Sequence, residues 1–280
     1  MTREQEARPP LLVIVPGSVP IRQYLADLWH HRDLMTVFAL RDLKLRYRQT
    51  ILGASWVVLQ PLLAGGVLGF IFGRVAKLSS GGVNPYLFAF AGMLGWGIFS
   101  SCVTRTTSSL IGNASLVSKI FFPRLALPLS TSAAVVIDFM VSFVVLLVAE
   151  ISFGGLPGWS VLLLPLWVVL TLMLALGIGS FLAALSVRYR DIPQVTPVLL
   201  QLGLYASPVA YSISAIPGRF LGWYYLNPLA ALIEAFHWST VGTPAPSTGR
   251  IIYSATVAVV VFVAGMFGLE RLEKGFADVI

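Results

Sequence analysis

The chain has 280 residues, of which 57% are hydrophobic and 11% charged, and its mean hydropathy is +0.84. A soluble surface needs about a quarter charged residues, so this composition excludes a soluble globular protein. It indicates an all-α integral membrane protein without a sizeable extramembrane domain. The net charge of +7 comes from cations set between apolar runs, which is typical of membrane topology rather than nucleic-acid binding. The single cysteine, Cys102, excludes an internal disulfide and a cysteine-based metal site.

In chain order, we expect a flexible cytoplasmic tail over 1–20, an amphipathic interface helical region over 21–50 and a six-span transmembrane domain over 51–280. Each apolar run of the last part is close to the ~20 residues that cross ~30 Å of hydrocarbon. The expected spans are 52–72, 85–103, 129–149, 161–187, 193–211 and 251–269.

Basic residues form a stripe just before the first span. If Asp33 caps a helix, 100° per residue places Arg41, Lys44 and Arg48 in one sector, beside apolar residues that include Phe38. Such a helix can lie on a membrane surface, with Phe38 in the acyl boundary and the cations facing head groups or an acidic partner. The simpler interpretation, cations that only orient the first span, stays open.

Between the last two expected spans, residues 212–250 are only patchily apolar and contain glycine, asparagine and proline. We expect short re-entrant or interfacial helices there, because non-helical backbone survives at membrane depth only where protein or water covers it. On this topology, only four basic residues lie on the outer side: Arg74, Lys77, Arg219 and Arg250. The positive-inside rule then places both termini in the cytoplasm and the protein in the plasma (inner) membrane.

The motifs of common enzymes are absent from the sequence. It contains no GxxxxGK[ST] phosphate loop, no GxSxG and no HExxH, and its three histidines lack the spacing of metal ligands. We therefore predict a protein that is not an enzyme and binds no metal or cofactor itself.

An acidic residue, Asp138, falls near the middle of the third expected span, where an unpaired charge is costly. It should face the bundle interior, a water path or a cationic partner. One interpretation is a polar lining or proton-linked site. The other, which we favour because no chain of acids accompanies it, is a packing residue hydrogen-bonded to a serine or threonine.

Aromatic residues concentrate toward the outer half of the expected topology. An aromatic belt at the membrane interface explains them by default. Alternatively, their faces could line a conduit for a sliding sugar polymer, because rings contact the C–H faces of sugars without a fixed hydrogen-bond pattern. The candidates are Tyr86, Phe88, Trp96, Tyr205, Tyr211, Trp223, Tyr224 and Tyr225.

Several separated motifs resemble one known family. They are RDLKLRYRQTILGASWVVLQPLL from Arg41, NASLVSKIFFPRLALPLS from Asn113, VRYRDIPQV with YASPVAYS, YLNPLAALIEAF, and the C-terminal GFADVI. In this order they resemble the membrane-spanning subunit of bacterial ABC-type polysaccharide exporters, which move lipid-linked O-antigen, teichoic acid, capsule or galactan. The resemblance extends over nearly the whole chain from about Tyr24.

The resemblance implies a homodimeric permease that docks on two copies of a separate ATP-binding subunit, which supplies ATP and Mg²⁺. It implies an interface helix, with Arg41, Lys44, Arg46 and Arg48 as its basic residues, and a coupling helix over 113–124. In the coupling helix, the matching residues are Leu116, Lys119, Phe122, Pro123 and Arg124. The implied function is export of a polyprenyl-linked polysaccharide through a pore between two permease chains. Rival hypotheses are a drug or lipid exporter of the same fold and a membrane-bound glycan-processing enzyme.

Overall fold

The computed structural model describes residues 32–47, 55–77, 79–80, 82–114, 124–156 and 158–273. All regular elements in these ranges are helices, so the predicted all-α class is confirmed for the part of the chain that is described. The expected tail over 1–20 and the C-terminal GFADVI lie outside these residues.

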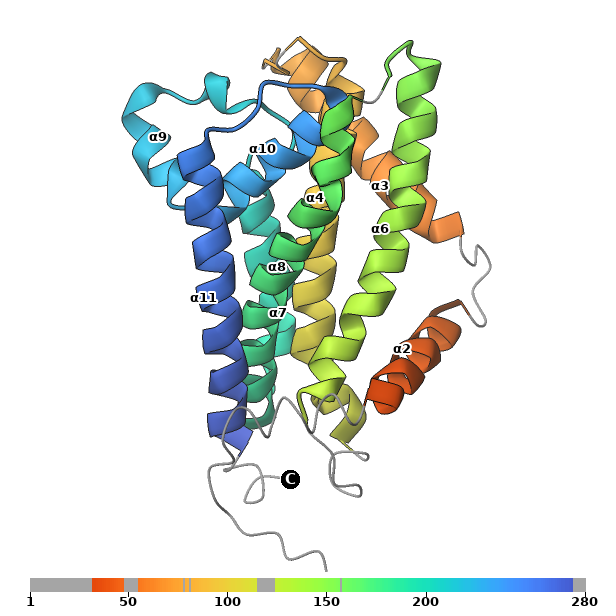
Figure 1. The fold of residues 1–280 in the computed structure, drawn as a ribbon, viewed down its shortest axis with the longest axis vertical. Helices are drawn as coiled ribbons and strands as arrows, with labels where there is room; N and C mark the ends of the chain where they lie inside the picture. The colour runs from red at the N-terminus through yellow and green to blue at the C-terminus, as the bar shows by residue number, and fades with distance from the viewer. Residues whose placement is uncertain are drawn as a thin grey trace, which may run out of the picture.

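Long helices stand side by side in one bundle (Figure 1). They are α3, Ser55–Leu68, continued by the π-helical Gly69–Val75; α4, Pro85–Ser108; α6, Ala126–Ser152; α7, Leu164–Arg188, preceded by the 3-10 turn Trp159–Leu163; and α11, Thr248–Glu273. Within the described residues, five stretches are long and apolar enough to cross a membrane: Val58–Val75, Pro85–Ser108, Ala126–Ser152, Trp159–Arg188 and Thr248–Glu273. They correspond to all the expected spans except the fifth.

The expected fifth span, 193–211, differs from the prediction. The structure has a shorter helix there, α8, Ile192–Tyr205, with 14 residues and Pro197 inside it. At 1.5 Å per residue it is about 21 Å long, which is less than the hydrocarbon thickness of ~30 Å. Irregular backbone follows as far as Ser212, whose N–H donates to the carbonyl of Ser79. The six-span count is therefore not confirmed by helix length.

Helix α4 occupies the centre of the bundle and contacts α3, α6, α7, α8 and α10. The small polar residues near its end pack against other helices, and Thr106 and Thr107 are fully buried. Thr107 donates to the carbonyl of Val103, and the hydroxyls of Thr106 and Thr131 lie 2.9 Å apart, which joins α4 to α6. These hydroxyls thus find partners within the protein, as burial requires.

Helices α7 and α11 run in close contact along their length, because glycines remove the side chains at their crossing. A Cβ on Gly177 would collide with the carbonyl of Val261, and one on Gly265 would collide with the backbone of Gly177. Small residues that let backbones approach in this way are typical of membrane helix pairs.

The two ends of the bundle carry different short elements. At one end lies α2, Arg32–Tyr47, beside the start of α6 (Figure 1). At the other end lie the 3-10 turn Ile213–Ala215, α9, Gly218–Tyr225, and α10, Pro228–Val241. We call them the α2 end and the α9 end. The short helices expected within 212–250 are present, and most of α10 is buried against α4, α7 and α11.

Candidate functional site

Helix α2, which lies in the predicted interface region, packs on the bundle through an apolar cluster separate from the main core. Phe38 is only 8% exposed and belongs to a second hydrophobic cluster, separate from the main core. The prediction that Phe38 dips into lipid is therefore wrong, because the ring finds apolar partners in the bundle. The cluster draws on α2, α6, α7, α11 and the connection after α4, and its other buried members are Leu110, Leu125, Ala126, Leu127, Ala183, Ala184, Val187 and Leu269.

A hydrogen bond joins the interface helix to the connection in which the coupling helix was predicted. The Arg41 guanidinium donates to Asn113 Oδ1 over 2.7 Å. Asn113 in turn donates to the carbonyl of Ser109 over 2.8 Å, which orients its amide. Lys44 is exposed, whereas Arg48 and the side chain of Arg46 lie outside the described residues. The two elements predicted to contact a partner are thus connected to each other.

An ion pair connects the far side of the same connection to the last helix. Arg124 Nε lies 3.1 Å from Glu273 Oε1, so the residue that precedes α6 is tied to the last turn of α11. The other predicted coupling residues, Leu116, Lys119, Phe122 and Pro123, lie outside the described residues, and their role stays a prediction. We call the Phe38 cluster and these two polar links the coupling junction.

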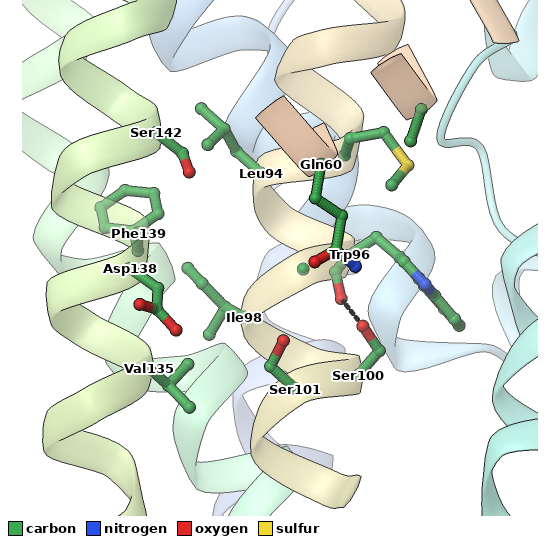
Figure 2. Close-up of a pocket in the computed structure, with 13 residues that line it drawn as sticks. Gln60, Leu94, Trp96, Ile98, Ser100, Ser101, Val135, Asp138, Phe139 and Ser142 are labelled. Carbon is green, nitrogen blue, oxygen red and sulfur yellow. Dashed lines mark hydrogen bonds between the residues drawn. The ribbon is translucent and has the colours of Figure 1, made fainter. Parts of the chain in front are cut away.

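A polar cavity of about 240 Å³ lies inside the bundle between α3, α4 and α6. Figure 2 shows Asp138, Ser101 and Ser142 directed toward the space between α4 and α6, with Gln60 entering from α3. Ser100 instead donates to the carbonyl of Trp96 within α4. Carboxylate, amide and hydroxyl groups at this depth need partners or water, because hydrocarbon supplies neither.

The partner of Asp138 is a cation on the neighbouring helix. Asp138 Oδ2 lies 3.2 Å from Arg105 Nη2, and the two side chains are 16% and 27% exposed. Because Thr106 meets Thr131, the backbone of Asp138 lies about two helical turns nearer the α9 end than that of Arg105. The arginine side chain therefore runs along the bundle to reach the carboxylate. The cationic partner that the sequence analysis allowed for Asp138 is therefore confirmed. The interpretation that we favoured, pairing with a serine or threonine alone, is not.

The candidate conduit aromatics do not share one environment. Phe88 is buried and stacks on His237 with ring centres 3.8 Å apart, while the His237 Nε2–H donates to the Phe88 carbonyl. Trp96 is buried near the middle of α4, and Tyr86 is half-buried at its start. Tyr205 on α8 and Trp223 on α9 are exposed, the latter by 75%. A role in a conduit stays a prediction for all eight.

Tyrosines at the α9 end form a hydrogen-bonded chain. Tyr211 donates its hydroxyl to the carbonyl of Tyr205, so the hydroxyl of Tyr224, 2.8 Å away, donates to Tyr211. Burial raises the pKa of Tyr224, which keeps this phenol protonated and able to donate. These hydrogen bonds connect α9 to the end of α8. Tyr225 instead lies under the guanidinium of Arg250.

Sequence reasoning missed the residues that join distant segments. Arg105 and Glu273 had no role in the sequence analysis, and Asn113 was only the first residue of the predicted coupling helix. Arg105, Arg124 and His237 each contact a residue that is between 33 and 149 positions away in the sequence. Pairs so far apart leave no local sequence pattern. A basic and an acidic residue inside apolar runs of neighbouring spans is the one signal that could have suggested the Arg105–Asp138 pair.

Comparison with known proteins identifies the family of this fold. The family model described as ABC-2 type transporter matches residues 34–240. The chain belongs to the ABC-2 type transporter membrane family. The match starts within α2, passes through the coupling junction and ends within α10, so it includes all the elements described above except α11.

Curated relatives of this ABC-2 chain are transport subunits. An O-antigen export system permease protein of Myxococcus xanthus, RfbA, is 31% identical over 91% of this chain and 98% of its own length. A Klebsiella pneumoniae protein of the same name is 29% identical over 89% and 95%. The polysialic acid transport protein KpsM of Escherichia coli is 24% identical over 70% and 76%. The chain is therefore an ABC transporter permease of the polysaccharide-export type and not an ATPase.

The Arg105–Asp138 pair makes a prediction about stability. Replacing Asp138 by Asn removes the carboxylate charge 3.2 Å from the Arg105 guanidinium, and we expect a loss of about 2 kcal/mol in the free energy of unfolding. The double variant Arg105→Met, Asp138→Leu should lose less than Asp138→Asn, because no buried charge remains. Thermal unfolding of the purified protein in detergent measures both. Equal losses for the single and double variants would contradict a charge-pairing role.

Proposed function

We propose that this permease is the transmembrane subunit of an ATP-driven exporter that carries a polyprenyl-linked polysaccharide from the cytoplasmic to the outer face of the membrane. Relatives named for O-antigen export and polysialic acid transport, aligned over most of the chain, support a glycan as the substrate. The polyprenyl carrier fits a substrate that must stay anchored in the membrane while its sugars cross.

The coupling junction is the observation that carries the proposal of an ATP-driven mechanism. It ties α2, the connection between α4 and α6, and the end of α11 into one packed unit at a single end of the bundle. A force applied to the connection would therefore move α6 and α11 together, because packed elements shift as bodies rather than deforming. An ATP-binding subunit docked there could drive the bundle without any catalytic group in this chain.

We further propose six crossings with both termini in the cytoplasm. The fifth crossing in chain order, which completes this count, consists of α8 and the irregular backbone that follows it. The chain leaves α7 at the α2 end, near Arg188, and Ser212 bonds Ser79 in the connection before α4, at the other end. The segment between them thus passes along the bundle from end to end. The concentration of basic residues at the α2 end makes that end cytoplasmic.

The proposed assembly has two permease chains and two ATP-binding subunits, which hold ATP and Mg²⁺. The glycan moves between the two permease chains. Large apolar side chains remain exposed along α3 and α8, including Leu63 and Val67 on α3 and Val198 and Leu202 on α8. In a bilayer such faces contact lipid or a second permease chain.

Depletion of the protein in its own cells tests the function. We expect a long lipid-linked glycan to accumulate on the cytoplasmic face, because its synthesis continues while its export stops. Mass spectrometry of extracted lipid-linked glycans detects the accumulation and identifies the sugar. Cells depleted of the protein but blocked in the first step of glycan synthesis are the control and should accumulate nothing.

Normal amounts of surface glycan in depleted cells, without cytoplasmic accumulation, would contradict the polysaccharide proposal. A drug or lipid exporter would then be the better explanation of the same fold.

A charge exchange at the coupling junction tests the mechanism. Arg124→Glu places two acids together, and we expect the protein to remain folded while surface glycan falls several-fold, because α6 and α11 lose their link. Adding Glu273→Arg restores an opposite-charge pair and should recover most of the export. Both variants are compared by surface glycan and by the amount of protein in the membrane. If the double variant Arg124→Glu, Glu273→Arg is stable but as inactive as Arg124→Glu, the proposed link between α6 and α11 is contradicted.

A further inference from the structure

A second and larger cavity, of about 460 Å³, lies at the α9 end. Its walls come from residues 208–216, α9, α10, the connection 243–246 and the start of α11, with Phe88 of α4 behind them. This volume is within the range of about 300–1,000 Å³ that is typical of small-molecule sites. It is separate from the coupling junction and from the polar cavity in the bundle.

A carboxylate in its wall has unused hydrogen-bonding capacity. Glu234 Oε2 is shielded and has no hydrogen-bond partner among the residues that the structure describes. Its nearest charged neighbour is Arg250 Nη1 at 3.8 Å, which is an ion pair but too long for a hydrogen bond. A carboxylate accepts at about four positions, so a buried one normally collects several donors. Burial raises the pKa of Glu234 and Arg250 only partly offsets this.

The guanidinium beside it is held in place by stacking. Arg250 lies with its central carbon 3.5 Å from the ring centre of Tyr225, and its side chain is 37% exposed. Stacking on an aromatic face fixes the plane of the guanidinium and directs its N–H groups to the side. A fixed donor group therefore stands in one wall next to a carboxylate that has one shielded oxygen without a donor among the described residues and a side chain that is 21% exposed.

The chemistry of this pair selects the kind of ligand. Glu234 and Arg250 together carry no net charge, so they favour neither a phosphate nor a cation. Adjacent donor and acceptor groups match two neighbouring hydroxyls, each of which can donate and accept. The rest of the wall mixes apolar and hydroxyl groups, namely Tyr211, Ser212, Ile213, Ser214, Thr243 and Pro244. Such a wall suits a ring with apolar C–H faces and a hydroxylated edge.

We propose that this cavity binds a neutral sugar unit of the exported glycan. Glu234 and Arg250 form hydrogen bonds to two neighbouring hydroxyls of that unit. This inference rests on the proposed export function and adds a defined subsite at the end of the bundle from which the glycan leaves. When the sugar is bound, its hydroxyls bridge Glu234 and Arg250, whose charged groups are 3.8 Å apart. The site would distinguish glycans by the hydroxyl pattern of the bound unit, because a mismatched unit leaves buried polar groups unpaired.

Protection of an introduced cysteine tests the proposal in the full exporter. Cys102 is the only cysteine in the sequence and is buried, so a Cys102→Ser background allows single-site labelling. Ser214→Cys places a thiol in the cavity wall, and Leu156→Cys places one at the same end outside it. Cells carry an ATP-binding subunit that cannot hydrolyse ATP, which holds glycan in the exporter. A membrane-impermeant maleimide is then applied with and without glycan synthesis.

We expect glycan synthesis to slow labelling of Ser214→Cys several-fold and to leave Leu156→Cys unchanged. Adding Glu234→Gln should remove most of this protection, whereas Glu150→Gln, a matched loss of charge at the same end but outside the cavity, should keep it. The membrane content of each variant shows that it is folded.

Equal labelling of Ser214→Cys with and without glycan would overturn the sugar site and leave the export function intact, provided that surface glycan depends on this protein in matched cells whose ATP-binding subunit hydrolyses ATP. Protection that persists unchanged in Glu234→Gln would overturn the role given to the carboxylate. Surface glycan that does not depend on the protein would instead overturn the proposed function itself.

Discussion

The structure depends on the lack of water in the hydrocarbon layer, where each polar group must find its partner inside the protein. Backbone groups do so as helices. Hydroxyls do so by bonding back to their own helix, as Thr104 does to the carbonyl of Ser100. Charges do so in pairs, and Asp138 accordingly lies against Arg105. The buried polar side chains of α4 satisfy this constraint. Among the described residues, one buried oxygen that has no hydrogen-bond partner is Glu234 Oε2, in the cavity at the α9 end.

The two ends differ in a way that suits directional export. At the α2 end, apolar packing and two polar links join α2, α6 and α11 into a unit that can transmit movement. At the α9 end, short helices are fastened by hydrogen bonds between side chains, such as those of Tyr211 with Tyr224 and of Asn227 with Ser207. Bonds of this kind exchange partners more readily than a packed core rearranges. In the proposed mechanism, energy enters at the packed α2 end and the glycan leaves through the α9 end.

Much of the fold could be predicted from the sequence because hydrocarbon imposes long apolar runs. Their lengths identify the spans that α3, α4, α6, α7 and α11 provide. The length of the helix at α8 was overestimated, since an apolar run with Pro197 inside it does not reveal where the helix ends. Periodicity likewise gave the stripe on α2 but not its surroundings, so Phe38 was assigned to lipid.

The candidate site could be predicted only in outline. Motif resemblance predicted a coupling region, which stays a prediction, whereas the partners of Arg41, Arg105 and Arg124 are set by how distant helices pack. Glu234 and Arg250 are 16 positions apart and flank a turn, and nothing in their local sequence indicates that they share a cavity. Such pairs become visible only in three dimensions because the bundle, not the local sequence, brings them together.

The most direct test of the account is transport by the reconstituted exporter. Proteoliposomes containing this permease, its ATP-binding subunit and the cell's lipid-linked glycan are given ATP on the side of the ATP-binding subunit. The account predicts that glycan becomes accessible to an impermeant lectin on the opposite side, and only when ATP can be hydrolysed. Hydrolysis of ATP that never exposes the glycan, in vesicles where both subunits are assembled, would contradict it.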